Sequence, residues 1–123
     1  MFKHILIQDV AYHSLLTQTR KQFHERVGSA TEEIYKDRLD EHCERLAFHY
    51  LQSGNRKKAL EYLLMAAKKA ANRFANVEAM TFCKEALKIL DQLANTEQNR
   101  KLREDLEFLQ LGLKAISDEI VPF

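Results

Sequence analysis

Apolar residues recur at helical spacing along most of this chain, with polar residues on the intervening positions. The segments Ala59–Ala67 and Ala79–Leu87 show the pattern best, since each alternates small and large apolar residues in the same order. Small residues let two helices approach closely, and the large residues between them fill the seam. The stretch from Leu46 to Leu90 therefore predicts packed antiparallel helices, and the rest of the chain is organised around it.

Polar breaks divide the pattern into about six helices. Their expected ranges are 8–16, 19–34, 39–53, 56–74, 76–93 and 96–121. The short apolar stretch 2–7 fits either the end of a strand or the start of a helix. A break is expected at 17–19, a weak point near Gly28, and an end to the last helix at Pro122.

Several helix ends carry capping signals. Thr19 with Gln22 three residues later has the form of a capping box. Gly54 suits the left-handed geometry of a helix end, and Asn55 is placed to cap the next helix. We expect Asn76 to cap the helix after that, and Asn95 or Thr96 to cap the last one.

The spacing also predicts which side chains face inward. They are Phe23, Val27, Ala30 and Ile34; Leu39, Cys43, Leu46 and Tyr50; Leu60, Leu63, Ala67, Ala70 and Phe74; Ala79, Phe82, Cys83, Ala86, Leu87, Leu90 and Leu93; and Leu102, Leu106, Leu109, Leu113, Ile116 and Ile120. The last helix carries a second apolar line of Phe108, Leu111 and Ala115. Either this line is partly exposed or something outside this chain covers it.

Length and composition indicate a single all-helical domain. The chain has 123 residues, one proline and three glycines, with 46% hydrophobic and 30% charged residues. A formal net charge of +1 argues against a general nucleic-acid or membrane binder, and the basic clusters 56–58 and 68–73 are interpreted as solvated helix faces. Cys43 and Cys83 fall in apolar stripes, which predicts reduced, buried thiols in a cytoplasmic protein. The sequence has no apolar run of about 20 residues that would cross a bilayer.

The sequence predicts no catalytic, cofactor or metal site. The three glycines are isolated, so no phosphate-binding loop is expected. His24–Glu25 resembles the opening of a zinc-protease motif, but Gly28 stands where the second histidine belongs. His42, Cys43 and His49 lie on one helix in directions that do not converge on an ion.

Six residues resemble a tetratricopeptide repeat, a helix pair with small residues at its crossing; they are Leu46, Ala47, Tyr50, Gly54, Ala59 and Ala66. Cys43 replaces a large aromatic of that repeat, and Ala71 replaces its helix-ending proline. The resemblance implies antiparallel helix pairs in a short right-handed superhelix, with residues 39–94 as the best repeat-like part and 96–121 as a terminal helix.

A second resemblance covers residues 2 to about 95. It rests on Phe2–His4, Leu6–Tyr12, Ser14–Leu16, Arg20, Phe23–His24, Leu46–Ala47, His49–Tyr50, Ala75–Asn76 and Glu78–Ala79. These residues are similar to the segment that follows the ATPase module in large bacterial signal-transduction proteins, many of them fused to class III adenylate or guanylate cyclase or protein kinase domains. The resemblance implies that residues 1–18 end an upstream winged-helix-like region, and that the chain is a regulatory or scaffolding arm.

The leading functional hypothesis is a non-enzymatic module that binds a protein segment or its own parent's catalytic domains. The expected groove residues are His42, Arg45, His49, Gln52, Lys69, Asn72 and Arg73. One alternative is a dimerisation element that uses Phe108, Leu111 and Ala115 on the terminal helix. Another alternative, disfavoured by the near-neutral charge, is a nucleic-acid module of winged-helix type.

Overall fold

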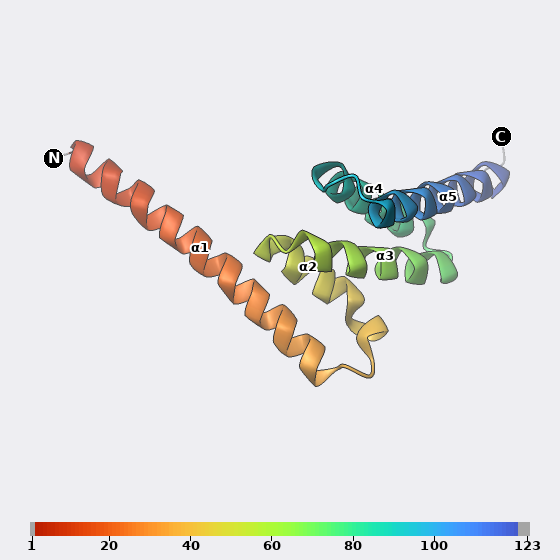
Figure 1. Cartoon of the computed structure of the whole chain (residues 1–123), viewed down its shortest axis with the longest axis horizontal. Helices are drawn as coiled ribbons and strands as arrows, with labels where there is room; N and C mark the ends of the chain where they lie inside the picture. The colour runs from red at the N-terminus through yellow and green to blue at the C-terminus, as the bar shows by residue number, and fades with distance from the viewer. Residues whose placement is uncertain (1, 121–123) are drawn as a thin grey trace.

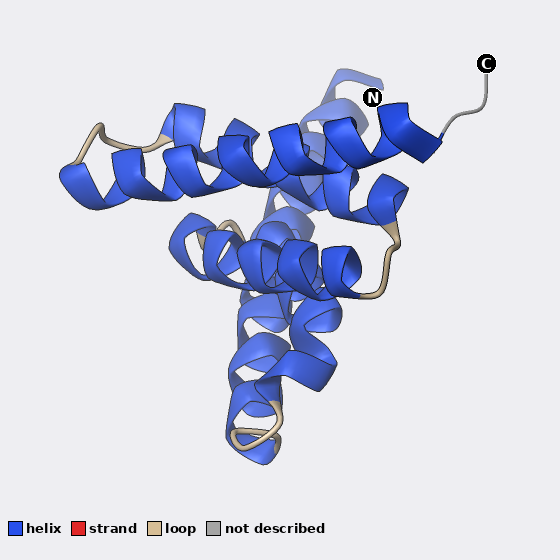
Figure 2. Ribbon diagram, turned by 90° about the vertical axis from the view of Figure 1, so that its right-hand side faces the viewer, coloured by secondary structure: helices blue, strands red, loops and turns tan. Residues whose placement is uncertain are grey.

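The computed structural model describes the backbone of residues 2–120, and side-chain burial over residues 13–115. Its elements are α1 (Phe2–Ile34), η1 (a 3₁₀ helix, Leu39–His42), α2 (Cys43–Ser53), α3 (Arg56–Asn72), α4 (Asn76–Gln92) and α5 (Glu97–Ile120). The described residues contain helices and short loops without any strand, which confirms the all-α class (Figure 2). The expected number of about six α-helices is wrong, because the first two are one.

Helix α1 runs without interruption through the break that the sequence predicted at 17–19. The Thr17 hydroxyl donates a hydrogen bond of 2.9 Å to the His13 carbonyl, one helical turn back. A threonine that bonds in this way is accommodated within a helix, and no glycine or proline interrupts this stretch. Residues 2–7 are therefore helical. Thr19 lies inside α1 and is not the N-cap that its sequence pattern predicted.

Only the C-terminal half of α1 packs on the rest of the protein. Residues 13–23 are exposed, and Figure 1 shows the N-terminal half projecting away from the other helices. The predicted inward face is wrong, since Phe23 is 60% and Ile34 is 71% exposed. The buried positions are Gly28 and Thr31, a small residue and a threonine whose hydroxyl bonds to the Val27 carbonyl.

The turn between α2 and α3 agrees with the sequence signals. Gly54 adopts a φ of 85°, and its amide donates to the Tyr50 and Leu51 carbonyls. The Asn55 side chain accepts from the Lys58 amide, as an N-cap does. Glycine is suited to this left-handed geometry because it has no Cβ.

The turn between α3 and α4 differs from the prediction. Phe74 has a φ of 60°, and its side chain is 81% exposed instead of facing inward. Helix α3 ends at Asn72, and Ala75, not Asn76, occupies the N-cap of α4 without a side-chain hydrogen bond. A left-handed backbone at residue 74 reverses the chain and turns the ring away from the core.

The core lies between α2, α3, α4 and the inner face of α5. Its buried residues are Cys43, Leu46, Ala47, Tyr50, Ala59, Leu60, Tyr62, Leu63, Ala66, Ala67, Ala70, Ala79, Cys83, Ala86, Ile89, Leu90, Leu106 and Leu113. Alanines account for six of the twelve buried residues of α3 and α4, and these small side chains allow the helices to pack closely. The predicted inward residues of α2, and most of those of α3 and α4, are thus confirmed.

Helix α5 packs on α4 through one face. Thr96 caps it by accepting a 3.1 Å hydrogen bond from the Asn99 amide, one of the two caps foreseen. Leu106 and Leu113 are buried, whereas Phe108, Leu111 and Ala115 are exposed. The second apolar line therefore lies on the surface of this chain. Pro122 lies outside the described residues.

Candidate functional site

The carboxylate of Glu32 connects α1 to α2 and α3. One of its oxygens accepts a hydrogen bond from the Tyr50 hydroxyl and the other accepts one from the Tyr62 hydroxyl. Lys58 Nζ lies 2.7 Å from Oε2 and 3.0 Å from Oε1. The two tyrosine rings are stacked with centroids 5.8 Å apart. We call Glu32, Tyr50, Lys58 and Tyr62 the Glu32 cluster; it holds the packed half of α1 in place.

Burial and hydrogen bonding shift the pKa values in this cluster. Burial alone would raise the pKa of Glu32, but hydrogen bonds from Lys58 and the two tyrosines outweigh it and hold the pKa below its usual value. The pKa values of Tyr50 and Tyr62 are raised, mainly by burial and secondly by the hydrogen bond that each hydroxyl donates to the Glu32 carboxylate. The carboxylate is therefore ionised and both phenols are protonated at neutral pH.

A second contact between α1 and α2 consists of aromatic side chains. His24 Nδ1 lies 2.9 Å from His49 Nδ1, so one imidazole donates a hydrogen bond and the other accepts it. The ring of Phe48 meets both imidazoles edge-on. Burial, followed by the positive charges of His24 and Arg45, lowers the pKa of His49. This contact consequently requires at least one neutral imidazole.

Four helices converge on a cavity of about 350 Å³ that we call the cationic hollow. It is lined by Lys21 of α1, Tyr50, Leu51 and Gly54 of α2 and its turn, Arg56 and Ala59 of α3, and Glu85, Lys88, Ile89 and Gln92 of α4. Three lining residues are cationic and one is anionic. Glu85 is itself 3.8 Å from Lys88, an exposed pair that contributes little. The lining of the hollow includes the apolar side chains Leu51 and Ile89 and carries an excess of positive charge.

Three of the seven residues predicted to bind a partner contact other side chains of the chain, and four are exposed. His42 stacks on Tyr35, with ring centroids 3.9 Å apart, and His49 is engaged by His24. Lys69 pairs with Glu44 at 3.1 Å, beside the start of α2. The other four, which are Arg45, Gln52, Asn72 and Arg73, are exposed. None of the seven lines the cationic hollow.

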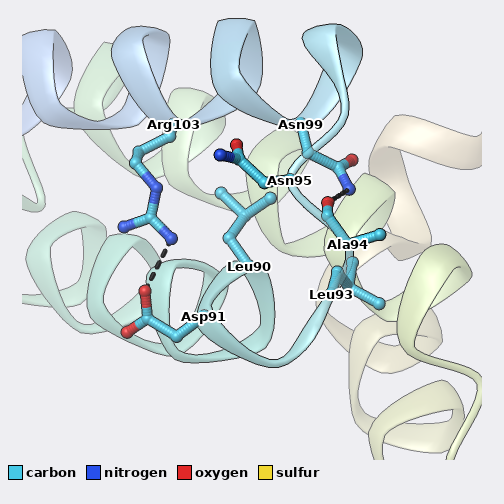
Figure 3. A pocket seen from close by; sticks show the side chains of 7 residues that line it. All are labelled: Leu90, Asp91, Leu93, Ala94, Asn95, Asn99 and Arg103. Atoms are coloured by element: carbon cyan, nitrogen blue, oxygen red, sulfur yellow. Dashed lines mark hydrogen bonds and ion pairs between the residues drawn. The ribbon is translucent and has the colours of Figure 1, made fainter.

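Two further cavities flank the α4–α5 connection. In the first, of about 250 Å³, Arg103 donates a 2.6 Å hydrogen bond to Asp91, and Asn99 donates one to the Ala94 carbonyl (Figure 3). These contacts close the turn between the two helices. The second, of about 400 Å³, lies between α3 and this connection; its leucines are Leu60, Leu64, Leu93 and Leu102.

The part of the chain that the structure describes contains no group of three or more histidine, cysteine or acidic residues arranged to hold a metal ion. Cys43 and Cys83 are free, fully buried thiols, as predicted from their apolar stripes. Burial raises the pKa of both thiols, so neither is an activated nucleophile. Among the described residues, no helix is long and apolar enough to cross a membrane.

Sequence reasoning missed the residues that define these sites. The basic cluster 56–58 predicted only a solvated helix face, and Lys21 and Lys88 gave no signal, because the convergence of these charges depends on how three helices pack. Glu32 gave no local signal, since it is one of several polar residues at the end of α1. Arg56 alone had a usable signal, because it directly follows the capping residue Asn55 and must lie beside the turn.

Comparison with known proteins finds similarity to part of a much longer protein. No family model matches it, and no solved structure matches it. An uncharacterized protein of Rhizobium meliloti (strain 1021) is 28% identical over 109 residues, which is 83% of this chain and 10% of that protein. The chain thus spans about a tenth of the length of the curated relative that it matches.

Proposed function

We propose that this chain is a non-enzymatic helical-repeat module that binds a protein segment in the cationic hollow. The convergence of four helices on that hollow is the observation that carries the proposal. The apolar lining residues can contact an anchoring side chain of the segment, and the charged lining residues favour oppositely charged residues beside that anchor.

The bound segment should be acidic, with an apolar residue between its carboxylates. Lys21, Arg56 and Lys88 outnumber Glu85, so the charge of the hollow is complementary to aspartate and glutamate. Leu51, which is 38% exposed, and Ile89, which is 6% exposed, both line the hollow, so Leu51 provides most of the apolar contact. Such a segment can come from another protein or from the same longer chain.

Internal repetition supports the tetratricopeptide-like interpretation. In α2 the buried residues Cys43, Leu46, Ala47 and Tyr50 follow one another at spacings that recur in α4 as Ala79, Phe82, Cys83 and Ala86. Equivalent faces of successive helices that pack in the same way are typical of helical repeats. The right-handed superhelix remains our proposal, and it would make the hollow part of its inner surface.

A binding experiment tests this function directly. The probe is a fluorescein-labelled peptide of glutamates around two central leucines, compared with the same peptide carrying lysines. We expect binding of the acidic peptide that weakens with salt, and that falls about threefold to tenfold for Arg56→Glu or Lys88→Glu. Lys36→Glu, in the exposed turn after α1, is the matched control.

The same titration separates the hollow from the surface predicted from sequence. If Arg45→Glu and Arg73→Glu reduce binding while Arg56→Glu does not, the site lies at the exposed ends of α2 and α3. Equal binding of the lysine peptide, or tighter binding of a DNA duplex than of the acidic peptide, would overturn the proposal.

We also propose that the module acts in the cytoplasm as a regulatory arm of a multidomain signalling ATPase or nucleotide cyclase. The support is the family resemblance together with a curated relative about ten times longer than the matched segment. A partner that binds one arrangement of such a protein better than another shifts that equilibrium by its differential affinity. An antibody blot of the source cells should show a band far above 14.4 kDa, and a band at that mass would exclude the parent protein.

A further inference from the structure

The outer face of α5 carries an apolar strip that no other helix contacts in the described structure. Phe108 is 80% and Leu111 is 67% exposed. Ala115 is exposed, and a Cβ built on Gly112 would meet nothing within 4 Å. Spacings of three, four and seven place these residues on one face, roughly opposite Leu106 and Leu113, which pack on α4.

We propose that this face binds a second copy of the chain, with the two α5 helices antiparallel and Phe108 of each copy packed against Leu111 of the other. A twofold axis then passes between these residues, so one patch is complementary to itself. The surface is separate from the cationic hollow, and the inference stands independently of the proposed function.

Charge complementarity argues for a second copy as the occupant. Glu107 and Lys114 lie along the same edge of the strip, seven residues apart. In the antiparallel register that pairs Phe108 with Leu111, Glu107 of one copy lies beside Lys114 of the other, and symmetry repeats the pair. Along the opposite edge, Gly112 lies near Asp105 of the other copy and leaves it room.

The antiparallel direction follows from the residues at the ends of the strip. It places Glu104 opposite Ala115, a small neutral residue. A parallel pair would bring Arg100 beside Asp105, but it would also set Glu104 against Glu104 and Lys101 against Lys101 at the centre of the contact. Like charges directly opposite one another are destabilising, so the antiparallel pair is preferred.

Four large apolar side chains with a charged border make a small interface, which implies a weak, concentration-dependent dimer. Sedimentation equilibrium of the whole chain over a range of concentrations should show monomer and dimer. Leu111→Glu should abolish the dimer, whereas Lys68→Glu, on the exposed face of α3, should leave it intact. Circular dichroism of each variant checks that the fold is retained.

A charge-swap series tests the register. Glu107→Lys and Lys114→Glu should each weaken dimerisation about threefold or more, and the double variant should restore it, since the two pairs are then re-formed with exchanged signs. Failure of the double variant to restore the dimer would overturn the register.

Disulfide trapping tests the direction. Glu104→Cys with Ala115→Cys in one chain should give an oxidised dimer, whereas either cysteine alone should not; Cys43 and Cys83 are fully buried and do not interfere. Cross-linking of Glu104→Cys alone would indicate parallel helices, and a strict monomer at high concentration would exclude the dimer. Either result would overturn the proposal.

Discussion

Gly28 of α1 lies directly against the ring of Tyr50 of α2. A Cβ at residue 28 would be 2.8 Å from Tyr50 Cζ and 3.0 Å from Cε2, closer than carbon atoms approach without displacement. The glycine therefore lets α1, which continues through this residue, pack directly on Tyr50. It brings the backbone of α1 close enough for Glu32 to reach the Tyr50 hydroxyl.

We expect Gly28→Ala to destabilise the protein by about 1–3 kcal/mol, because overpacking the ring outweighs the gain in helix propensity. Gly112→Ala is the matched control, since its Cβ would enter open space. That variant should gain about 0.5–1 kcal/mol from helix propensity alone. Urea unfolding at low protein concentration measures both, and a Gly28→Ala variant as stable as Gly112→Ala would contradict the close contact.

The lowered pKa of Glu32 makes stability depend on pH in the acid range. A folded-state pKa below the unfolded value means that the stabilisation is complete above the unfolded pKa, near 4.3. It is lost as the pH falls through the folded value. Glu32→Gln should lower the free energy of unfolding at neutral pH and reduce its fall in acid. Glu33→Gln, at the neighbouring exposed position, should change neither.

The raised pKa values of Tyr50 and Tyr62 predict the opposite dependence in alkali. The unfolded state loses the phenolic protons near pH 10, before the folded state does, so stability is complete below that pH and falls above it. An absorbance titration of tyrosinate should show two delayed residues, and Tyr62→Phe should remove one. We also expect Tyr62→Phe to cost about 1.5–3 kcal/mol, as the loss of a hydrogen bond to a charged acceptor does. Ordinary titration of all the tyrosines in the native state would contradict this.

His49 adds a dependence near neutral pH. Its pKa is lowered by burial and then by the positive charges of His24 and Arg45, so the unfolded state takes up its proton more readily. Stability is therefore present above the unfolded pKa of about 6.5 and falls as the pH drops through the folded value. Urea unfolding between about pH 8 and pH 5 should show this fall, and His49→Gln should flatten it. His13→Gln, which removes an exposed histidine, should leave the fall unchanged.

Burial should protect both native thiols from modification. Cys43 and Cys83 are fully buried, and their pKa values are raised by loss of solvent, so the reactive thiolate is both rare and inaccessible. A maleimide reagent should label neither cysteine in the folded protein and both in denaturant. A cysteine at the exposed position 29, Ser29→Cys, should react rapidly in the native state and serves as the positive control.

Local sequence signals predicted α2, α3 and the turn between them. The stripe of Cys43, Leu46 and Tyr50 faces inward as its spacing requires, and Gly54 ends α2 where expected. The same reasoning failed at Phe74, which its spacing placed in the core. An apolar residue at the right spacing packs only if the helix continues through it, and here the backbone leaves the helix first.

The sequence by itself determined the all-helical class, the inner faces of α2, α3 and α4, and the capped turn at residues 54 and 55, because these depend on residues within one or two helical turns. Only the tertiary structure decided which face of α1 packs and which charges meet. Glu32 accepts hydrogen bonds from Tyr50 and Tyr62, which are eighteen and thirty residues away along the chain. The apolar periodicity predicted that Phe23 and Ile34 face inward. In the structure, the face of α1 that carries Gly28 and Glu32 packs inward instead, because Tyr50, Tyr62 and Lys58 donate hydrogen bonds to Glu32. A contact between distant elements depends on both surfaces, and the spacing along one helix describes only one of them.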